Sequence, residues 1–429
     1  MNFSLGFVKG LGVCVFACLP FVSYANGFAI NIQSASGAGT GEAGRASTVL
    51  DVTVIYGNPA GLVRLERPQV VAGFGAVKAS LDISDGQGMT GYGMPVSGSN
   101  EGDSVPNVYV PFSFASVPVN ERLAFGVGVY VPFGLINDYE PVFMGRYHGV
   151  YSKVAVTTVQ PTVSYRVNEW ISVGFGPTIN RIVGRLKNNV DTRLLGGGDA
   201  LVDVKGSDSG AMGFNVGVMF DLAPGTTVGM TYHSRVDYKL TGRTRVSGLG
   251  GGLALANGRY DARLDITLPE SVDFSVTHKV SDAWTLYGGA TWTRWSRLKL
   301  IDIYNRDVPV AMFGHLSESF NWHNTWSLAI GASYQVSPAL VLRAGLTFDE
   351  SPTDDVYRNV RIPVADRRIF ALGAGWTPTE DWTFDFAYTY LWEKDARINQ
   401  PVKSALVPSY SAEYRNRAHG VAFQVTRRF

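Results

Sequence analysis

The chain has 429 residues, and its 37 Lys and Arg against 36 Asp and Glu give a formal net charge of +1. This balance implies no polyanionic partner and argues against nucleic acid binding. Both cysteines, Cys14 and Cys18, lie within the first 25 residues, so the rest of the chain has no thiol for disulfide or thiolate chemistry. No later segment reaches eighteen consecutive apolar residues, the length that a membrane-spanning helix needs.

Residues 1–25 have the pattern of a secretory signal peptide. Lys9 precedes an apolar run from Leu11 to Val22, and Ser23-Tyr24-Ala25 supplies small residues before a cut. A lipoprotein signal using Cys18 is the alternative, but a bulky aromatic residue stands two positions before that cysteine. We therefore expect cleavage after residue 25.

The next segment, residues 26–66, follows neither a helical nor a strand period over any long span. It is rich in Gly, Ala, Ser and Thr and contains Asn58-Pro59-Ala60-Gly61. Small side chains allow a folded segment to approach a surrounding wall closely. We therefore expect residues 26–66 to form a plug, or hatch, inside the lumen of a β-barrel.

Residues 67–429 read as strands and turns throughout. Apolar and polar or small residues alternate in many segments, as in Trp382, Phe384 and Phe386 against Thr383 and Asp385. A membrane protein without long apolar runs must close its sheet into a barrel, because lipid satisfies no backbone hydrogen bond. We expect an all-β, 14-stranded antiparallel outer-membrane barrel with strands at 67–83, 106–118, 121–134, 152–167, 170–187, 209–222, 226–244, 262–280, 284–303, 319–336, 340–350, 367–377, 381–395 and 415–429.

The connections and the C-terminus indicate the orientation of this barrel. Short turns such as 168–169 and 281–282 alternate with long loops such as 84–105 and 396–414, as at the periplasmic and extracellular ends of outer-membrane barrels. An even strand number places both termini on the short-turn, periplasmic side. The last strand ends on Phe429, which resembles the terminal signal read by the barrel assembly machinery.

Several motifs in chain order resemble one family. They are Gly27-Phe28, Gln33-Ser34-Ala35-Ser36-Gly37, Asn58-Pro59-Ala60-Gly61, Val131-Pro132-Phe133-Gly134-Leu135, Gly145-Arg146-Tyr147-His148, Trp292-Thr293-Arg294-Trp295-Ser296 and Asp385-Phe386-Ala387-Tyr388. They are similar to motifs of the FadL family of outer-membrane transporters, which includes long-chain fatty acid transporters and toluene/xylene channels. The resemblance implies a monomer in the Gram-negative outer membrane, in contact with its lipid and lipopolysaccharide, without cofactor or metal.

The third strand is the candidate place for lateral exit of a ligand. A closed barrel seals its wall by continuous hydrogen bonding, so sideways release needs a local break. Proline has no N–H to donate and glycine permits bulges, and this strand contains Gly126, Gly128, Pro132 and Gly134. The resemblance implies a gap at this strand; the alternative is that Pro132 and Gly134 merely end it.

A carboxylate ligand would need a cation or hydrogen-bond donors in the lumen. The resemblance places Phe28 close to the ligand, with Asn58, Pro59 and Ala60 in the same hatch. It suggests Arg181, Arg185 and His323 as possible carboxylate contacts, although the side of the wall that the two arginines face is open. We expect Arg235, Lys239 and Arg343 to face inward and to pair with Asp237 or Asp385 rather than with a ligand.

The remaining motifs indicate no cofactor, metal or catalytic site. Gly39–Gly44 matches G-x-G-x-x-G but follows no strand, and the six histidines lack metal-ligand spacing. No G-x-S-x-G is present, so we expect no enzyme. The expected function is hatch-gated diffusion of hydrophobic molecules, most of all long-chain fatty acids, with lateral exit into the membrane. Aromatic hydrocarbons such as toluene or xylene are the first alternative; a general porin, a barrel enzyme or an adhesin is the next.

Overall fold

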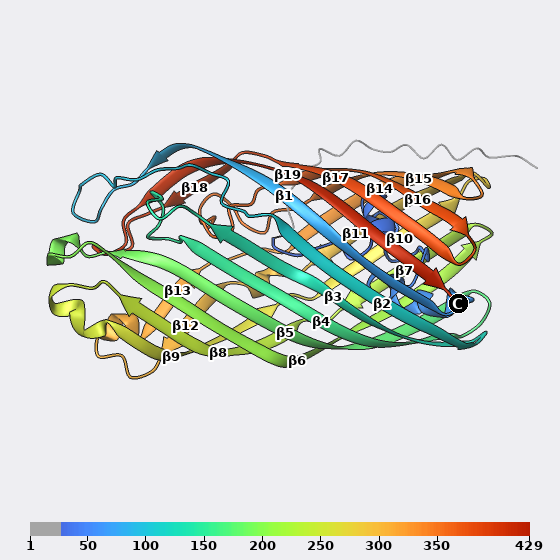
Figure 1. Cartoon of the computed structure of the whole chain (residues 1–429), viewed down its shortest axis with the longest axis horizontal. Helices are drawn as coiled ribbons and strands as arrows, with labels where there is room; N and C mark the ends of the chain where they lie inside the picture. Colours follow the sequence, from blue (N-terminus) through green and yellow to red (C-terminus); the bar gives the residue numbers. More distant parts are fainter. Residues whose placement is uncertain (1–26) are drawn as a thin grey trace, which may run out of the picture.

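The computed structural model describes residues 27–429, which form an elongated closed β-barrel around an N-terminal segment (Figure 1). We use "N-terminal segment" for residues 27–66. The signal peptide expected over residues 1–25 lies outside the described residues. The barrel closes because β1 pairs with β19 along a ladder that runs from Gln69↔Arg428 to Gln87↔Ser411.

The N-terminal segment contains three short helical pieces, α1 (Ala35–Ala38), α2 (Val54–Gly57) and the 3-10 helix η1 (Pro59–Arg64). The strands are β1 (Gln69–Gln87), β2 (Val108–Asn120), β3 (Leu123–Asp138), β4 (Tyr151–Arg166), β5 (Ile171–Asp191), β6 (Asp199–Ala223), β7 (Thr226–His233), β8 (Val236–Ser247), β9 (Gly258–Leu268), β10 (Ser271–Lys279), β11 (Trp284–Thr293), β12 (Leu300–Asn305), β13 (His315–Ser319), β14 (Thr325–Ser337), β15 (Leu340–Asp349), β16 (Arg367–Thr379), β17 (Trp382–Glu393), β18 (Ala396–Gln400) and β19 (Tyr410–Arg428). Further 3-10 turns are η2 (Arg193–Leu195), η3 (Gly251–Ala256), η4 (Trp295–Arg297) and η5 (Ala311–Phe313). Within residues 27–429, the search for a helix long and apolar enough to span a membrane finds none.

These strands fill fourteen positions around the barrel, which we call staves, and the expected 14-stranded antiparallel barrel is confirmed. Nine staves are single strands, and five are made of two strands in line: β7 with β8, β9 with β10, β11 with β12, β13 with β14, and β17 with β18. The strands reach further toward the long loops than expected. β5 and β6, for example, leave only residues 192–198 between them.

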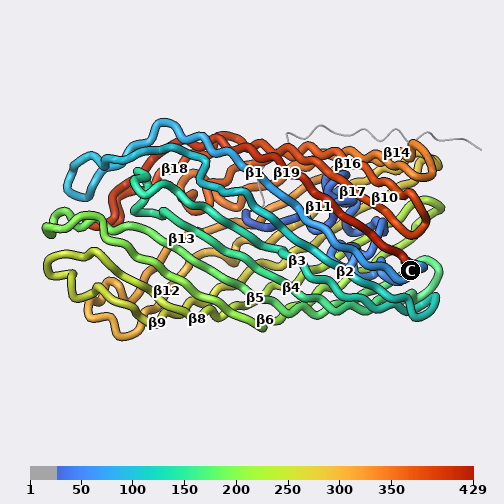
Figure 2. The backbone as a smooth tube through the Cα atoms, viewed as in Figure 1, coloured from blue at the N-terminus to red at the C-terminus, as the bar shows by residue number. Residues whose placement is uncertain are grey.

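In the half of the barrel nearer the short turns, outward side chains are apolar and inward ones are small or polar. Along β5, Val173, Phe175 and Ile179 are exposed on the outer face, while Thr178 and Asn180 are buried on the inner face. This pattern is typical of a barrel wall with lipid outside. The C-terminal Phe429 lies at this end, where its N–H donates to the carbonyl oxygen of Pro68 at 3.0 Å (Figure 2).

In the half nearer the long loops, which we call the long-loop half, the pattern is inverted. In β5 the inversion falls between Asn180 and Ile182: Arg181 is exposed, while Ile182 and the inward side chains that follow pack in an apolar cluster. β5 keeps its even-numbered side chains inward throughout, so only the residue types change there. In the stave of β7 and β8 the faces themselves are exchanged by a break at Ser234-Arg235, since Thr231 and Tyr238 both face inward although their numbers differ in parity. A one-residue slip in a strand moves every later side chain to the other face.

The structure contradicts the inward orientation expected for Arg235 and Lys239 and agrees with the one expected for Arg343. Arg235 and Lys239 were expected to face inward, but they lie exposed on the outer face, because the break reverses the alternation. Arg343 does face inward, where its guanidinium meets the buried carboxylate of Asp385 at 2.7 Å. This pair is the structural lumen contact that was expected for Arg343.

Candidate functional site

The N-terminal segment is anchored to the wall by Asn58 and Pro59. The buried Asn58 amide donates to the carbonyl oxygens of Ala46 at 2.6 Å and Val218 at 3.0 Å, and its oxygen accepts from the N–H of Ala60. A Cβ built on Gly174 of the wall would stand 2.2 Å from Pro59. Glycine is therefore required there for the segment to approach so closely.

The ladder between β2 and β3 is incomplete. It runs from Asn120↔Leu123 only to Ser113↔Val129. Within residues 27–429, the stretch 108–112 of β2 pairs with β1 but has no ladder partner in β3. On its other side, β3 carries an extra residue between Tyr130 and Phe133, which is a β-bulge in the β3–β4 ladder. The wall is therefore not continuously hydrogen-bonded at β3.

The N-terminal segment supplies the hydrogen bonds that the wall lacks at this place. Ile30 N–H donates to the Pro132 carbonyl oxygen at 2.9 Å, and Gly134 N–H donates to the Phe28 carbonyl oxygen at 3.1 Å. Ala29 and Phe133 form an antiparallel bridge between these bonds. The Gln33 amide donates to the carbonyl oxygen of Val131 at 2.5 Å. A short extended stretch of the segment thus lies along the free edge of β3.

Phe28 lies in an apolar cluster that lines the lumen in the long-loop half. Its ring is 5.0 Å from that of Trp295, 5.9 Å from that of Trp322 and 5.9 Å from that of Phe133, measured between centroids. The cluster continues along the wall through side chains of β4, β5, β8 and β9: Val156, Ile182, Tyr238, Leu240 and Leu268. Phe28 is buried in it, so the segment contributes an aromatic side chain to the apolar lining of the lumen.

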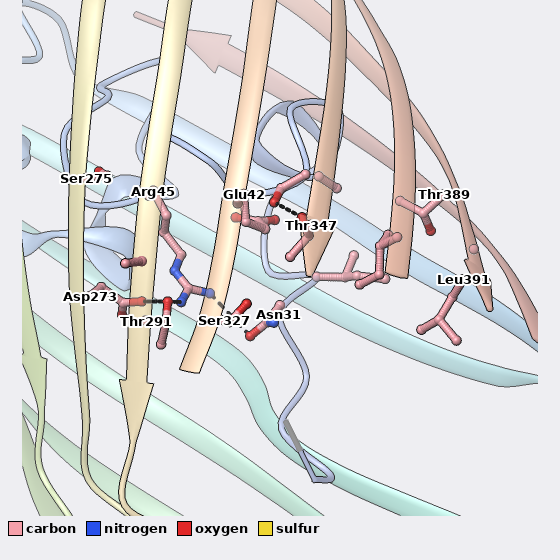
Figure 3. A pocket seen from close by; sticks show the side chains of 18 of the residues that line it. Asn31, Glu42, Arg45, Asp273, Ser275, Thr291, Ser327, Thr347, Thr389 and Leu391 are labelled. Carbon is pink, nitrogen blue, oxygen red and sulfur yellow. Dashed lines mark hydrogen bonds and ion pairs between the residues drawn. The ribbon is translucent and has the colours of Figure 1, made fainter. Parts of the chain in front are cut away.

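Two cavities lie between the N-terminal segment and the wall, and they share Asn31, Arg45 and Thr291. The first, of about 120 Å³, is mainly apolar and is shown in Figure 3; Ile32, Ala329, Ile369 and Leu391 are among its lining residues. The second, of about 70 Å³, adjoins the bulge of β3 and is lined by Pro132, Phe133, Tyr130 and Asn215. Arg45 therefore stands between an apolar cavity and the interrupted part of the wall.

Arg45 is held in place from both sides. Its guanidinium forms an ion pair with Asp273 of β10 and donates to Asn31 at 3.2 Å and to Thr291 at 3.0 Å (Figure 3). His233 approaches the second oxygen of Asp273 at 3.0 Å. The Nε–H of Arg45 is buried and, among the described residues, has no hydrogen-bond partner. This donor is free to meet an acceptor brought by a ligand.

Glu42, a near neighbour of Arg45, also lines the first cavity. Burial raises the pKa of the Glu42 carboxyl to about 7, while the positive charge of Arg45 acts in the opposite direction. One Glu42 oxygen has no hydrogen-bond partner among residues 27–429. Near neutral pH this carboxyl is therefore divided between its neutral and charged forms, and the neutral form leaves more net positive charge around Arg45.

The predicted residues of the third strand divide into two groups. Pro132 and Gly134 lie at the interrupted edge, beside the N-terminal segment. Gly126 and Gly128 lie nearer the short turns, where they are paired with Ser116 and Phe114 of β2. An added Cβ at Gly128 would stand 2.6 Å from the Phe114 ring. Pro132 and Gly134 thus lie where the β2–β3 ladder is missing, and Gly126 and Gly128 lie in paired wall against the segment; exit of a ligand at these residues stays a prediction.

The predicted carboxylate contacts do not line the cavities. Arg181 and Arg185 of β5 lie on the outer face, where Arg185 pairs with Asp203 at 2.7 Å. His323 is exposed in the break between β13 and β14, while its neighbour Trp322 points into the apolar cluster. Arg181 and Arg185 stay on the outer face of Val173 and Phe175 because β5 keeps its alternation past Pro177, and His323 belongs to no strand.

Asn58, Pro59 and Ala60 were expected near the ligand together with Phe28. They line neither cavity and act as the anchor described above, whereas Phe28 is in the apolar cluster. Sequence reasoning missed Arg45, although it is one of the few charged residues in the small-residue segment 26–66. Trp295 was noted only as part of the motif Trp292–Ser296 and Trp322 only within an expected strand; a break in each stave turns both of them inward.

The comparisons with known proteins agree on the family. A family model described as outer membrane protein transport protein (OMPP1/FadL/TodX) matches residues 16–429. The chain is 28% identical over 445 residues to a putative outer membrane protein of Neisseria meningitidis serogroup B, with 95% of each protein covered. It is 23% identical over 442 residues to the long-chain fatty acid transport protein of Escherichia coli O6:H1, with 96% of each covered.

Two solved structures have the same fold. A FadL homologue of Pseudomonas aeruginosa superposes with a TM-score of 0.86 at 23% identity, covering 94% of this chain and 99% of the other. The toluene transporter TbuX of Ralstonia pickettii superposes with a TM-score of 0.66 at 18% identity, covering 90% and 95%. At these identities the likeness establishes the architecture and leaves the ligand open.

Proposed function

The chain belongs to the OMPP1/FadL/TodX family of outer membrane transport proteins for hydrophobic compounds, and from this premise we propose that it takes up long-chain fatty acids. In this proposal the N-terminal segment acts as a hatch, and the ligand leaves sideways into the membrane beside β3. The family consists of transport channels and not of enzymes.

The observation that carries the choice of a fatty acid is the buried Nε–H of Arg45, which is unpartnered among the described residues and stands at the edge of an apolar cavity. A fatty acid is an apolar chain that ends in a carboxylate. Burying that anion requires a cation or donors, and a guanidinium supplies both. The chain would lie along the apolar cluster around Phe28 and the carboxylate would meet Arg45 and Asn31.

The energetics favour lateral release. Each methylene removed from water contributes about 0.8 kcal/mol, so a chain of sixteen carbons gains on the order of 12 kcal/mol. Release into water would lose this gain, whereas release into the bilayer keeps it. The interrupted β2–β3 ladder is the place where the wall is not closed by its own hydrogen bonds.

The gate in this proposal is the stretch of the N-terminal segment along β3. Each of its hydrogen bonds to Pro132, Gly134 and Val131 is worth about 0.5–1.5 kcal/mol net, so all of them together are worth a few kcal/mol. A ligand that replaced Phe28 among Trp295 and Trp322 would gain more than this from its own burial. Binding would then release the segment from the edge of β3.

Aromatic hydrocarbons are the second candidate ligands, and one observation favours them. Phe28, Phe133, Trp295 and Trp322 form an aromatic group with ring distances of 4.9 to 6.0 Å, a geometry that suits a planar aromatic guest. Such a ligand carries no charge, so it would make no use of Arg45.

The test compares uptake of labelled oleate and labelled toluene by cells that lack their own transporters. Arg45→Gln with Asp273→Asn removes both charges of the buried pair, because removing one alone leaves a costly unpaired charge. We expect the wild type to accumulate oleate and the double variant to take it up at least tenfold more slowly. Arg343→Gln with Asp385→Asn is the matched control, since this buried pair lines neither cavity.

The outcomes separate the candidates. Oleate uptake that depends on Arg45 and not on Arg343 supports the fatty acid proposal. Uptake of toluene alone, at the same rate in both double variants, would indicate that aromatic hydrocarbons are the ligands. Faster entry of small sugars with neither ligand enriched would contradict the hatch and favour a general porin.

A further inference from the structure

A row of four basic residues crosses the outer face of the barrel in the long-loop half. Lys153 of β4 is paired with Arg185 of β5, Arg185 with Lys205 of β6, and Lys205 with Arg243 of β8. These strands lie side by side in Figure 1. Lys153, Lys205 and Arg243 are exposed and Arg185 is partly so, while the residues that alternate with them, such as Val154 and Val204, pack inward.

Such a row is unfavourable by itself. Side chains directly opposite one another in a sheet have Cβ atoms roughly 5 Å apart, and like charges at this distance repel. Acidic neighbours compensate two of the four: Asp203 is 2.7 Å from Arg185, and Asp261 is 4.0 Å from Arg243. Lys153 and Lys205 have no ion-pair partner among the described residues. The row therefore retains positive charge that an external anion would neutralise.

The position of the row along the barrel axis indicates which kind of anion it could meet. The outer face of β5 is apolar up to Ile179 and changes to Arg181 at the next outward position. Arg185, with Lys153 and Lys205 opposite it, follows two outward positions after Arg181, roughly 15 Å above Ile179 once the tilt of the strand is included. This is where the headgroups of the outer leaflet begin.

We propose that the row Lys153–Arg185–Lys205–Arg243 is a binding site for the phosphate groups of an anionic glycolipid of the outer leaflet, with its acyl chains against the apolar face below. Guanidinium and ammonium groups form charge-assisted hydrogen bonds with phosphate oxygens. A phosphorylated headgroup would lie across β4, β5, β6 and β8 and bridge the four cations. The site is separate from the lumen, so it holds whatever ligand the barrel transports.

The test measures binding of purified bisphosphorylated lipid A to the folded protein in a zwitterionic detergent. Lys153→Gln with Lys205→Gln removes the two uncompensated charges. A single Lys near an anionic lipid surface contributes about fivefold in affinity, so we expect the affinity for lipid A to fall by about 30-fold. Both residues are exposed, and the shift in gel mobility on heating checks that the barrel remains folded.

Arg122→Gln with Lys279→Gln is the matched control, because both residues are exposed at the short-turn end and the net charge changes equally. The control should bind lipid A as the wild type does, and dephosphorylated lipid A should bind the wild type as weakly as the Lys153/Lys205 variant binds the intact lipid. Equal affinity of the wild type and the Lys153/Lys205 variant would overturn the proposal. So would inorganic phosphate binding as tightly as lipid A, since the site would then hold a free anion.

Discussion

At the scale of single residues, the charged groups beside the cavities are placed by burial and by pairing. Arg45 and Asp273 are nearly buried and hold each other, whereas Glu42 has no comparable partner. For Glu42 burial outweighs the positive charge of Arg45, so its carboxyl keeps its proton to a higher pH. Glu42 is therefore the group in the N-terminal segment whose charge changes near neutral pH.

Glu42 makes stability depend on pH in a definite direction. Its pKa is about 7 in the folded protein against an ordinary value of 4.5, so the folded state binds the proton more tightly. The free energy of unfolding should fall as pH rises from about 4.5 through 7, by about 3 kcal/mol for this group. Urea unfolding in micelles between pH 5 and 8 should show this slope in the wild type and lose it in Glu42→Gln.

The comparison with Glu42→Gln is needed because another buried group acts in the opposite direction. Burial lowers the pKa of His148, in the loop before β4, to about 3, so its contribution to stability is lost as pH falls below its ordinary value of 6.5. The difference between wild type and variant removes this shared part. An identical slope in both proteins would contradict the assignment of the titration to Glu42.

At the scale of elements, β3 and the N-terminal segment meet along a stretch of only a few residues, so the contact can be reversible. The bridge between Ala29 and Phe133 is flanked by the bonds from Ile30 to Pro132 and from Gly134 to Phe28. Directly opposed residues between such bonds have Cα atoms about 4.5 Å apart, which a disulfide can span.

We therefore predict that Ala29→Cys with Phe133→Cys forms a disulfide that closes the gate. Both native cysteines lie within residues 1–25, so no other thiol competes once a signal peptide is removed. Oleate uptake should fall at least tenfold on oxidation and recover on reduction. Each single cysteine variant, given the same oxidant, is the control. Uptake that is unchanged in the fully cross-linked protein would show that the segment need not leave β3.

At the scale of the whole molecule, the barrel has an apolar outer face near the short turns and a charged outer face near the long loops. On β5 the two faces meet between Ile179 and Arg181. On β5 the inward face is continuous across this boundary, and its residues change from Thr178 and Asn180 to Ile182, so the lumen is polar beside the lipid and apolar above it. Below the boundary apolar side chains cover the outside, and above it they line the cluster around Phe28.

This boundary can be measured with two matched substitutions on β5. Val173→Arg places a charge on the lipid-facing part of the outer face, and Val183→Arg places one above the boundary. We expect the first to cost about 2–4 kcal/mol of unfolding free energy and the second about 0–1 kcal/mol. Unfolding in lipid bilayers measures both. Equal costs would place the boundary elsewhere on the strand.

The sequence by itself determined the class of the molecule and the number of its strands. Alternation, turn residues and chain length are local properties, and lipid allows only a closed sheet, so fourteen staves follow from the pattern. The small residues of the N-terminal segment and the proline of β3 are also features of the local sequence. They identified the two elements that contact each other in the structure. The motif around Phe28 indicated the residue that lies in the apolar cluster.

Only the tertiary structure decided which side chains face the lumen and which meet. Alternation repeats every two residues, so the breaks at Ser234-Arg235 and in β3 reverse the face of everything beyond them, and no periodicity reveals such a slip. This is why Arg235 and Lys239 were assigned to the wrong face. The pair Arg45–Asp273 joins residues 228 positions apart, and the basic row crosses four strands. The first depends on how the N-terminal segment lies inside the wall, and the second on the register of neighbouring strands, which shifts by one residue between Asn180 and Arg181 in the β5–β6 ladder.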